Sequence, residues 1–107
     1  GTGAPFMGHG DHPTFIRQAQ AVMGKTAGIR RMGAAALDLA YVASGRLDGF
    51  WESPLNAWDI CAGIVLVREA GGYVTEIGGG NGMMTSGSVL AANDQLHRPL
   101  GDLLRSA

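Results

Sequence analysis

Residues 56–72 read Asn-Ala-Trp-Asp-Ile-Cys-Ala-Gly-Ile-Val-Leu-Val-Arg-Glu-Ala-Gly-Gly, and they carry the clearest structural signal in the chain. Asn56 is a favoured capping residue, and an acid at Asp59 suits the positive first turn of a helix. The apolar run 60–67 follows, and the glycine pair 71–72 ends it. We therefore predict a helix that is nearly all apolar and, for that reason, central in the fold.

The segments on either side alternate between strand and helix patterns. Strands are expected over 1–6, 29–32, 47–52, 73–77 and 89–92, and further helices over 13–23, 34–44 and 99–106. Loops or turns are expected over 7–12, 78–87 and 95–98. The alternation predicts an α/β fold with a mainly parallel sheet of about five strands and helices on both faces. The aromatic-rich strand 47–52 suits burial on both of its faces.

Composition limits the possible classes of protein. The 107 residues include 8 Lys plus Arg and 9 Asp plus Glu, which indicates one domain over 1–107 with no basic surface for nucleic acid. A single cysteine and the lack of an apolar run of roughly 18 residues argue against a disulfide scaffold and a membrane protein, and favour the cytoplasm. Charged residues make up 16% of the chain, against about 25% in average soluble domains. We therefore expect an oligomer or a partner domain to cover part of the surface.

Three places in the sequence are candidates for ligand binding, because ligands of open α/β sheets gather outside the carboxyl ends of strands. Glu52 closes a predicted strand, and Asp59 lies in the first turn of a predicted helix. Gly33, Ala34 and Ala35 open another helix with little bulk over its free amides, where an anion or a hydroxyl group could approach closely. Spacing alone also fits ordinary structural roles: a solvated strand end, a helix-capping acid and close helix packing.

Other polar and reactive residues favour structural roles. His9, Asp11 and His12 could ligate a transition metal, although a solvated loop is the simpler interpretation. Cys61 lies in an apolar helix pattern with no histidine beside it in sequence, which predicts a packed core thiol. The glycine loop 78–82 lacks the Lys-Ser/Thr ending of a phosphate-binding loop. No Gly-x-Gly-x-x-Gly motif follows a strand, which disfavours dinucleotide binding.

The chain resembles the inositol monophosphatase family. The blocks that carry the resemblance are Trp-Asp-Ile-Cys-Ala-Gly at 58–63 with Arg-Glu-Ala-Gly-Gly at 68–72, the run Arg-Met-Gly-Ala-Ala-Ala-Leu-Asp-Leu-Ala-Tyr-Val-Ala-Ser-Gly at 31–45, Asp-Gly-Phe-Trp-Glu at 48–52, Thr-Gly-Ala-Pro-Phe at 2–6 and the glycine loop and strand at 78–93. Together they cover essentially the whole chain. Fructose bisphosphate, bisphosphonucleotide and histidinol phosphate enzymes share this plan, but 33–52 is most similar to bacterial inositol monophosphatases.

The resemblance implies a Mg²⁺-dependent phosphomonoesterase, in which metal ions activate a water for in-line attack on phosphorus. It implies that Asp59 is a metal ligand and that Glu52 hydrogen-bonds a hydroxyl group of the substrate. The backbone near Ala35, with Ala34 and Gly33, would contact the substrate ring. The implied partners are a small phosphate ester and a second copy in a homo-oligomer such as a dimer.

The sequence also departs from the family pattern. Family enzymes carry a glutamate and an Asp-Pro-Ile-Asp-Gly-Thr type motif in an N-terminal half, and this sequence contains neither. One aspartate would bind Mg²⁺ poorly. We therefore expect the C-terminal domain of the inositol monophosphatase fold without its N-terminal metal-binding half, inactive by itself. The alternative is a non-catalytic α/β module for oligomerisation or regulation, in which Asp59 only caps a helix.

Overall fold

A computed structural model describes residues 1–5 and 10–107 of the chain. Its elements, in order, are α1 (His12–Met23), α2 (Ala35–Ala43), β1 (Gly49–Glu52), α3 (Ala57–Glu69), β2 (Tyr73–Thr75), α4 (Met83–Ser86), β3 (Val89–Ala92) and α5 (His97–Arg105). The predicted α/β class is confirmed. None of the helices in the described part is long and apolar enough to cross a membrane. The predicted strand end at residue 6 and the loop residues 7–9 lie outside the described residues.

The sheet has three strands in the order β1-β3-β2, and both pairings are antiparallel. The prediction of a mainly parallel sheet of about five strands is therefore wrong for the described residues. The segment 29–32 forms no strand, and 1–5 contributes one isolated parallel bridge, between Thr2 and Trp51. β1 and β2 do run in the same direction across α3, because both oppose β3. Strand β3, the last of the three in sequence, lies between β1 and β2 and runs antiparallel to both. The hydrophobic pattern of a single segment does not reveal this order.

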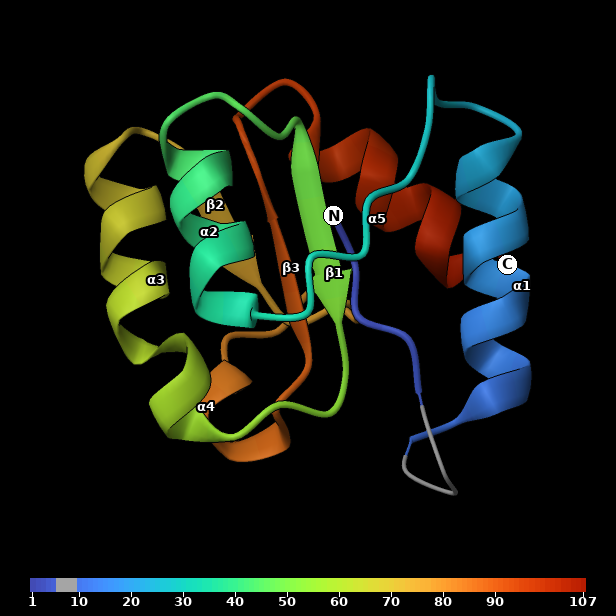
Figure 1. The fold of residues 1–107 in the computed structure, drawn as a ribbon, viewed down its shortest axis with the longest axis horizontal. Coiled ribbons are helices and arrows are strands. Elements are labelled where there is room, and N and C mark those ends of the chain that lie inside the picture. The colour runs from blue at the N-terminus through green and yellow to red at the C-terminus, as the bar shows by residue number, and fades with distance from the viewer. Residues whose placement is uncertain (6–9) are drawn as a thin grey trace.

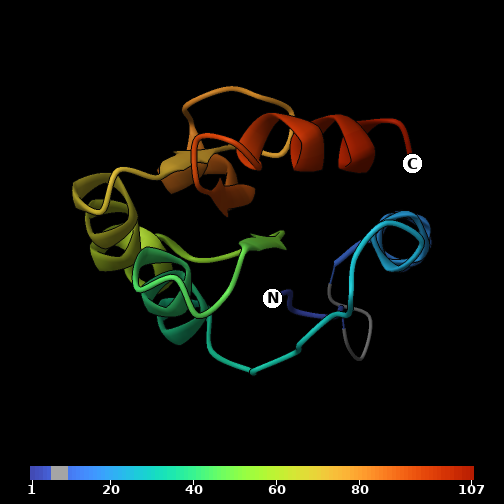
Figure 2. The same ribbon diagram turned by 90° about the horizontal axis from the view of Figure 1, so that it is seen from above.

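Helices cover both faces of this sheet, as predicted (Figure 2). The α2 and α3 helices pack on one face against a cluster that includes Phe50 and Ala91, and α1 and α5 pack on the other against Trp51 and Leu90. Successive strand residues point to opposite faces, so the neighbours Phe50 and Trp51 enter different cores. This confirms the predicted burial of β1 on both faces.

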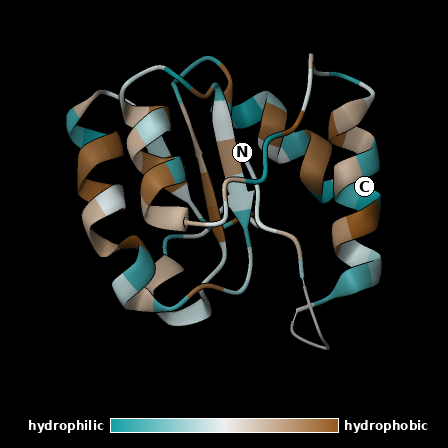
Figure 3. Cartoon of the chain, viewed as in Figure 1, coloured by the Kyte–Doolittle hydropathy of each residue, from teal (hydrophilic) through white to brown (hydrophobic). Residues whose placement is uncertain are grey.

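Helix α3 is capped as predicted but is not central. Its buried residues are Ile60, Gly63, Ile64 and Val67, whereas Trp58 is 78% exposed. Cys61 is exposed as well, so its predicted place in the core is wrong. The sheet is only three strands wide, and α3 lies at the outside of the molecule (Figure 3), where its buried residues form one stripe along the helix. When a helix has apolar residues on all of its sides, its sequence does not indicate which side will be buried.

Helices α2 and α3 approach each other closely at Gly63. A Cβ atom at this position would lie 2.6 Å from the Cβ of Leu39, which is fully buried. Only a glycine leaves room for this contact. The two helices start toward the same end of the molecule, where β1 ends (Figure 1).

Several element boundaries differ from the prediction. The loop expected over 78–87 contains the short helix α4, β1 starts two residues later than expected, and β2 ends at Thr75. Helix α5 starts at His97 instead of Pro99. Proline is tolerated there because the amides of a first helical turn have no partner within the helix.

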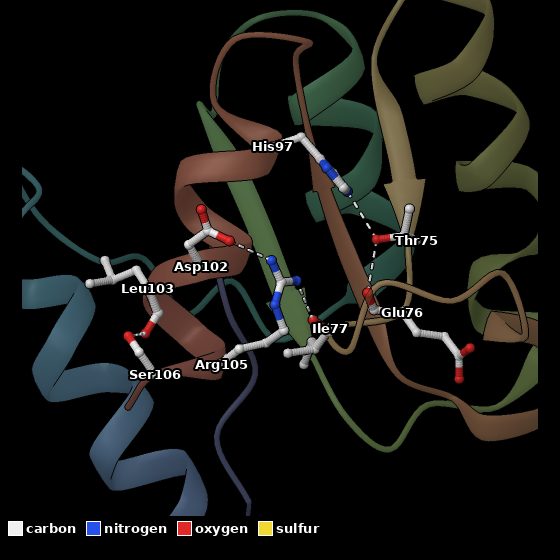
Figure 4. A network of polar contacts seen from close by, with 8 residues as sticks. All are labelled: Thr75, Glu76, Ile77, His97, Asp102, Leu103, Arg105 and Ser106. Carbon is white, nitrogen blue, oxygen red and sulfur yellow. Dashed lines mark hydrogen bonds and ion pairs between the residues drawn. The ribbon is translucent and has the colours of Figure 1, made fainter.

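Polar contacts hold α5 against the end of β2 (Figure 4). His97 Nε2 lies 2.9 Å from Thr75 Oγ1, and the Arg105 guanidinium donates to the carbonyl of Ile77 at 3.0 Å. Arg105 also pairs with Asp102 at 2.7 Å. These contacts fix the helix across the sheet edge opposite β1.

Candidate functional site

The residues predicted to bind ligand lie at one end of the molecule. Glu52 is the last residue of β1, Ala35 is the first residue of α2, and Asp59 lies in the first turn of α3. Figure 1 shows the carboxyl end of β1 and the starts of both helices toward the same end of the fold. Elements far apart in sequence therefore bring these positions together.

Glu52 has the most perturbed carboxyl group of the set. Its pKa is raised from 4.5 to about 7, mainly by burial and further by the charges of Asp38 and Asp59, while the charge of Arg31 opposes this rise. Charges act on each other over short distances in a folded protein, so this pattern places all three charged groups in the neighbourhood of Glu52. A carboxyl group in this state can donate or accept a hydrogen bond near neutral pH.

Arg31 lies just before the start of α2, and its positive charge lowers the pKa of Glu52. Its Nη1 atom lies 3.3 Å from the position of a Cβ on Gly33, whose φ is +87°. Gly33 and Ala34 are exposed, whereas Ala35 is buried and belongs to the core cluster under α2. Ala34 at the cap position makes no side-chain hydrogen bond to the helix. The first amides of α2 are therefore open to a polar group, since a helix leaves its first N–H groups without partners.

Asp59 is half-buried and closes a capping box. Its Oδ2 atom accepts a hydrogen bond from the backbone N–H of Asn56 at 3.3 Å. The structural role that spacing predicts is therefore present. The Asp59 carboxylate nevertheless lies in the first turn of α3 and not in the core. This start of α3 is at the end of the molecule where β1 ends with Glu52 (Figure 1).

A magnesium site is not complete within the described residues. Mg²⁺ prefers six oxygen ligands in octahedral geometry. Over residues 1–5 and 10–107, no three His, Cys, Asp or Glu side chains gather closely enough to hold a metal ion. Asp59 and a readily protonated Glu52 are a donor set that does not fit such an ion without further ligands.

The candidate metal loop near the N-terminus serves as a helix cap. Asp11 accepts hydrogen bonds from the backbone N–H of Thr14 at 3.0 Å and from its hydroxyl at 2.7 Å, and these bonds lower the pKa of Asp11. His12 is the first residue of α1 and is exposed. His9 lies outside the described residues.

Sequence reasoning missed two residues near the site. Asp38 is only 1% exposed, and neither of its carboxylate oxygens has a hydrogen-bond partner within the part of the chain that the structure describes. Its burial raises its pKa. The available signal was an acid inside the apolar pattern Ala-Leu-Asp-Leu-Ala at 36–40. Arg31 gave no comparable signal, because only the fold brings it near Glu52.

Two hollows lie on the α1 side of the fold. One of about 760 Å³ lies between 25–30, the start of β1 and α5, and none of the predicted site residues line it. A second of about 470 Å³ has Gly3 and Glu52 in its wall, together with residues of α1. The 760 Å³ hollow is thus separate from the predicted site, whereas Glu52 belongs to the wall of the second hollow.

Comparison with known proteins finds close relatives. The model of the inositol monophosphatase family matches residues 5–106. The inositol-1-monophosphatase of Mesorhizobium japonicum is 53% identical over 100 residues, which are 94% of this chain and 38% of that protein. The Nus factor SuhB of Pseudomonas aeruginosa is 44% identical over 102 residues, 94% of this chain and 38% of that protein.

A solved structure shares the same architecture. The extragenic suppressor protein suhB of Bartonella henselae superposes with a TM-score of 0.95 at 46% identity, over 99% of this chain and 40% of that one. The chain thus spans about two fifths of the length of the relatives that it matches. The matching part is an α/β portion of their larger fold.

Proposed function

The chain belongs to the inositol monophosphatase family, and on this premise we propose that the whole protein hydrolyses inositol monophosphate or a related small sugar or polyol phosphate. In this proposal the 107 residues form the C-terminal domain of a Mg²⁺-dependent phosphatase. The similarity to a protein named inositol-1-monophosphatase supports this substrate class.

The proposal is supported by the positions of Glu52, Asp59 and the start of α2, which all lie toward the same end of the fold (Figure 1). Glu52 binds a hydroxyl group of the substrate, to which its carboxyl group can donate or accept a hydrogen bond. The backbone at Gly33, Ala34 and Ala35 contacts the substrate ring. Asp59 supplies one ligand to Mg²⁺, and the ligands that these residues lack come from the remainder of the enzyme.

The 107 residues by themselves are inactive in this proposal. They offer a single ligand for the metal, and hard divalent cations need several oxygens. The purified chain should release no phosphate from inositol monophosphate in the presence of Mg²⁺. Robust turnover by the chain alone would show that the remaining ligands are dispensable.

The central experiment measures phosphate release by the whole protein after the substitution Asp59→Asn. We expect kcat/KM to fall by about 100-fold or more, since loss of a charged group acting in the transition state costs several kcal/mol. The melting temperature should change little, because an asparagine amide oxygen can still accept the hydrogen bond from Asn56.

Asp94→Asn is the matched control, because Asp94 is an exposed acid in a turn. It should leave turnover and stability unchanged. Equal turnover by the Asp59→Asn variant and the unmodified protein would exclude Asp59 as a ligand, and with it this proposal for the site.

The second candidate is a non-catalytic module for oligomerisation or regulation. The name Nus factor, carried by a relative that is 44% identical, favours a role other than hydrolysis. The capping bond at Asp59 fits this candidate equally well. It predicts that Asp59→Ala reduces stability by about 1 kcal/mol, as loss of a helix cap does, and leaves the behaviour of the protein otherwise intact.

A further inference from the structure

Gly3 lies directly against the carboxyl group of Glu52. A Cβ atom on Gly3 would overlap the carboxyl carbon and both carboxyl oxygens of Glu52. The flat face of the carboxyl group thus rests on the backbone of Gly3. No other residue type leaves this space free.

The backbone conformation of Gly3 does not itself call for glycine. Six glycines of the described chain have a positive φ, and Gly3 is not one of them. An alanine could therefore adopt the backbone conformation at position 3 without strain. A side chain at position 3 would instead clash with the carboxyl group of Glu52.

Hydrogen bonds prevent the segment around Gly3 from moving aside. The Thr2 hydroxyl, which is buried, donates to the carbonyl of Trp51 at 2.8 Å, and the amide of Trp51 donates to the carbonyl of Gly1 at 3.2 Å. The amide of Thr2 donates to the carbonyl of Arg30 at 2.9 Å. The segment is therefore anchored to β1 on one side and to the chain before α2 on the other. A side chain on Gly3 would displace Glu52, which is the movable partner.

We propose that Gly3 is a positioning residue, which sets the place of the Glu52 carboxyl group by leaving room for it at the end of β1. The inference rests on the proposed function, in which Glu52 binds a substrate hydroxyl. Gly3 touches no substrate and acts only through Glu52. By fixing the carboxyl group of Glu52, Gly3 favours substrates that place a hydroxyl group within hydrogen-bond distance of this carboxyl group.

The test compares Gly3→Ala, Glu52→Asp and the double variant in the whole protein, with inositol monophosphate as substrate. Gly3→Ala should raise KM by about tenfold and change kcat little, since a hydrogen bond to a charged group is worth about this factor. The shorter aspartate side chain frees the space beside Gly3. Gly3→Ala should therefore cause no further loss in the Glu52→Asp background.

Gly78→Ala is the matched control, because no atom lies within 4 Å of a Cβ at Gly78 and its φ is not positive. It should leave KM unchanged. If the effects of Gly3→Ala and Glu52→Asp on KM multiply, Gly3 acts independently of Glu52 and the inference is overturned.

A crystal structure of the Gly3→Ala variant separates this inference from the proposed function. We expect the Glu52 carboxyl group to be displaced while 1–5 stays paired with β1. An unmoved carboxyl group would overturn the positioning role. If Glu52→Ala, which removes every hydrogen-bonding group of this side chain, leaves KM unchanged, the assigned role of Glu52 in substrate binding fails, whatever the structure of the Gly3→Ala variant shows.

Discussion

Asp38 shows how one buried side chain can oppose the stability of its own helix. It lies in α2, is almost fully buried, and has no hydrogen-bond partner for either oxygen in 1–5 or 10–107. A carboxylate without partners is costly in such a place, so the protonated form is favoured. Burial raises the pKa of Asp38. Natural proteins keep such a group where it serves something other than stability.

The raised pKa of Asp38 predicts a specific dependence of stability on pH. The folded state binds the proton more tightly than the unfolded state, in which the pKa is near 3.8. The contribution of Asp38 to the free energy of unfolding is therefore greatest below about pH 4 and is lost as pH rises through the folded pKa. Asp38→Asn should make this decline shallower, leaving the part that comes from the raised pKa of Glu52, and raise the free energy of unfolding at pH 7 by about 1 kcal/mol or more.

Urea denaturation of the protein between pH 4 and pH 8 measures this effect. The exposed Asp48 provides the control, and Asp48→Asn should leave the pH dependence as it is. An Asp38→Asn variant that is less stable than the unmodified protein at pH 7 would show that Asp38 has a partner in solution.

Helices α2 and α3 are held in a fixed relative position, because their contact at Gly63 is tightly packed. Leu39 fills the space over Gly63, so the helix axes are held at short distance. Their close packing brings the starts of both helices, and thus Gly33 and Asp59, toward the end of β1. The position of the candidate site is in this sense a consequence of helix packing.

Substituting Gly63 tests this packing. Gly63→Ala stabilises the helix by up to about 1 kcal/mol through helix propensity. The added methyl group, however, clashes with the side chain of Leu39, and such overpacking typically costs about 1–3 kcal/mol. We expect a net loss of about 1 kcal/mol in the free energy of unfolding. In the Leu39→Ala background, the added methyl group has room and Gly63→Ala should be neutral or stabilising. A loss of stability in both backgrounds would place the cost elsewhere than in the contact with Leu39.

The molecule as a whole exposes several large apolar side chains, among them Trp58, Val65 and Leu66 of α3. The outer face of α3, formed by Trp58, Cys61, Val65 and Leu66, is open in this chain. A low content of charged residues agrees with a surface meant to be covered. We predict that a second copy of the chain or the remainder of the enzyme covers this face.

Thiol labelling of Cys61 tests the covered face. In the whole protein, we expect Cys61 to react with an alkylating reagent at least about tenfold more slowly than it does in urea, because closed surfaces exclude reagents. Peptide mass spectrometry identifies the labelled cysteine. Equal rates in the folded and the unfolded protein would mean that the outer face of α3 stays open to solvent.

The local signals in the sequence were reliable where they depended on neighbouring residues. Asn56 and Asp59 predicted the start of α3, and Phe50 and Trp51 predicted a strand buried on both faces. The order of the strands was not predictable in this way. A βαβ pattern tells that β1 and β2 run in the same direction, but not that β3 lies between them.

The candidate site follows the same division. The residue types and the family blocks singled out Glu52, Asp59 and 33–35, because caps, strand ends and small residues are visible in a linear pattern. The surroundings of Glu52 are not visible there, because the contact with Gly3 and the charges of Arg31 and Asp38 come from segments far away in the sequence. The prediction that Cys61 is buried was wrong for a related reason. The sequence of an apolar helix does not reveal which of its sides faces the core.

The amino-acid sequence alone determined the α/β class, the capped helix after Asn56 and the family of this protein, because each depends on residues close together in the chain. Only the tertiary structure decided the antiparallel order of the sheet, the exposure of α3 and the seating of Glu52 against Gly3. Those features come from contacts between distant segments, in which competition for buried volume selects one arrangement among several that local preferences allow.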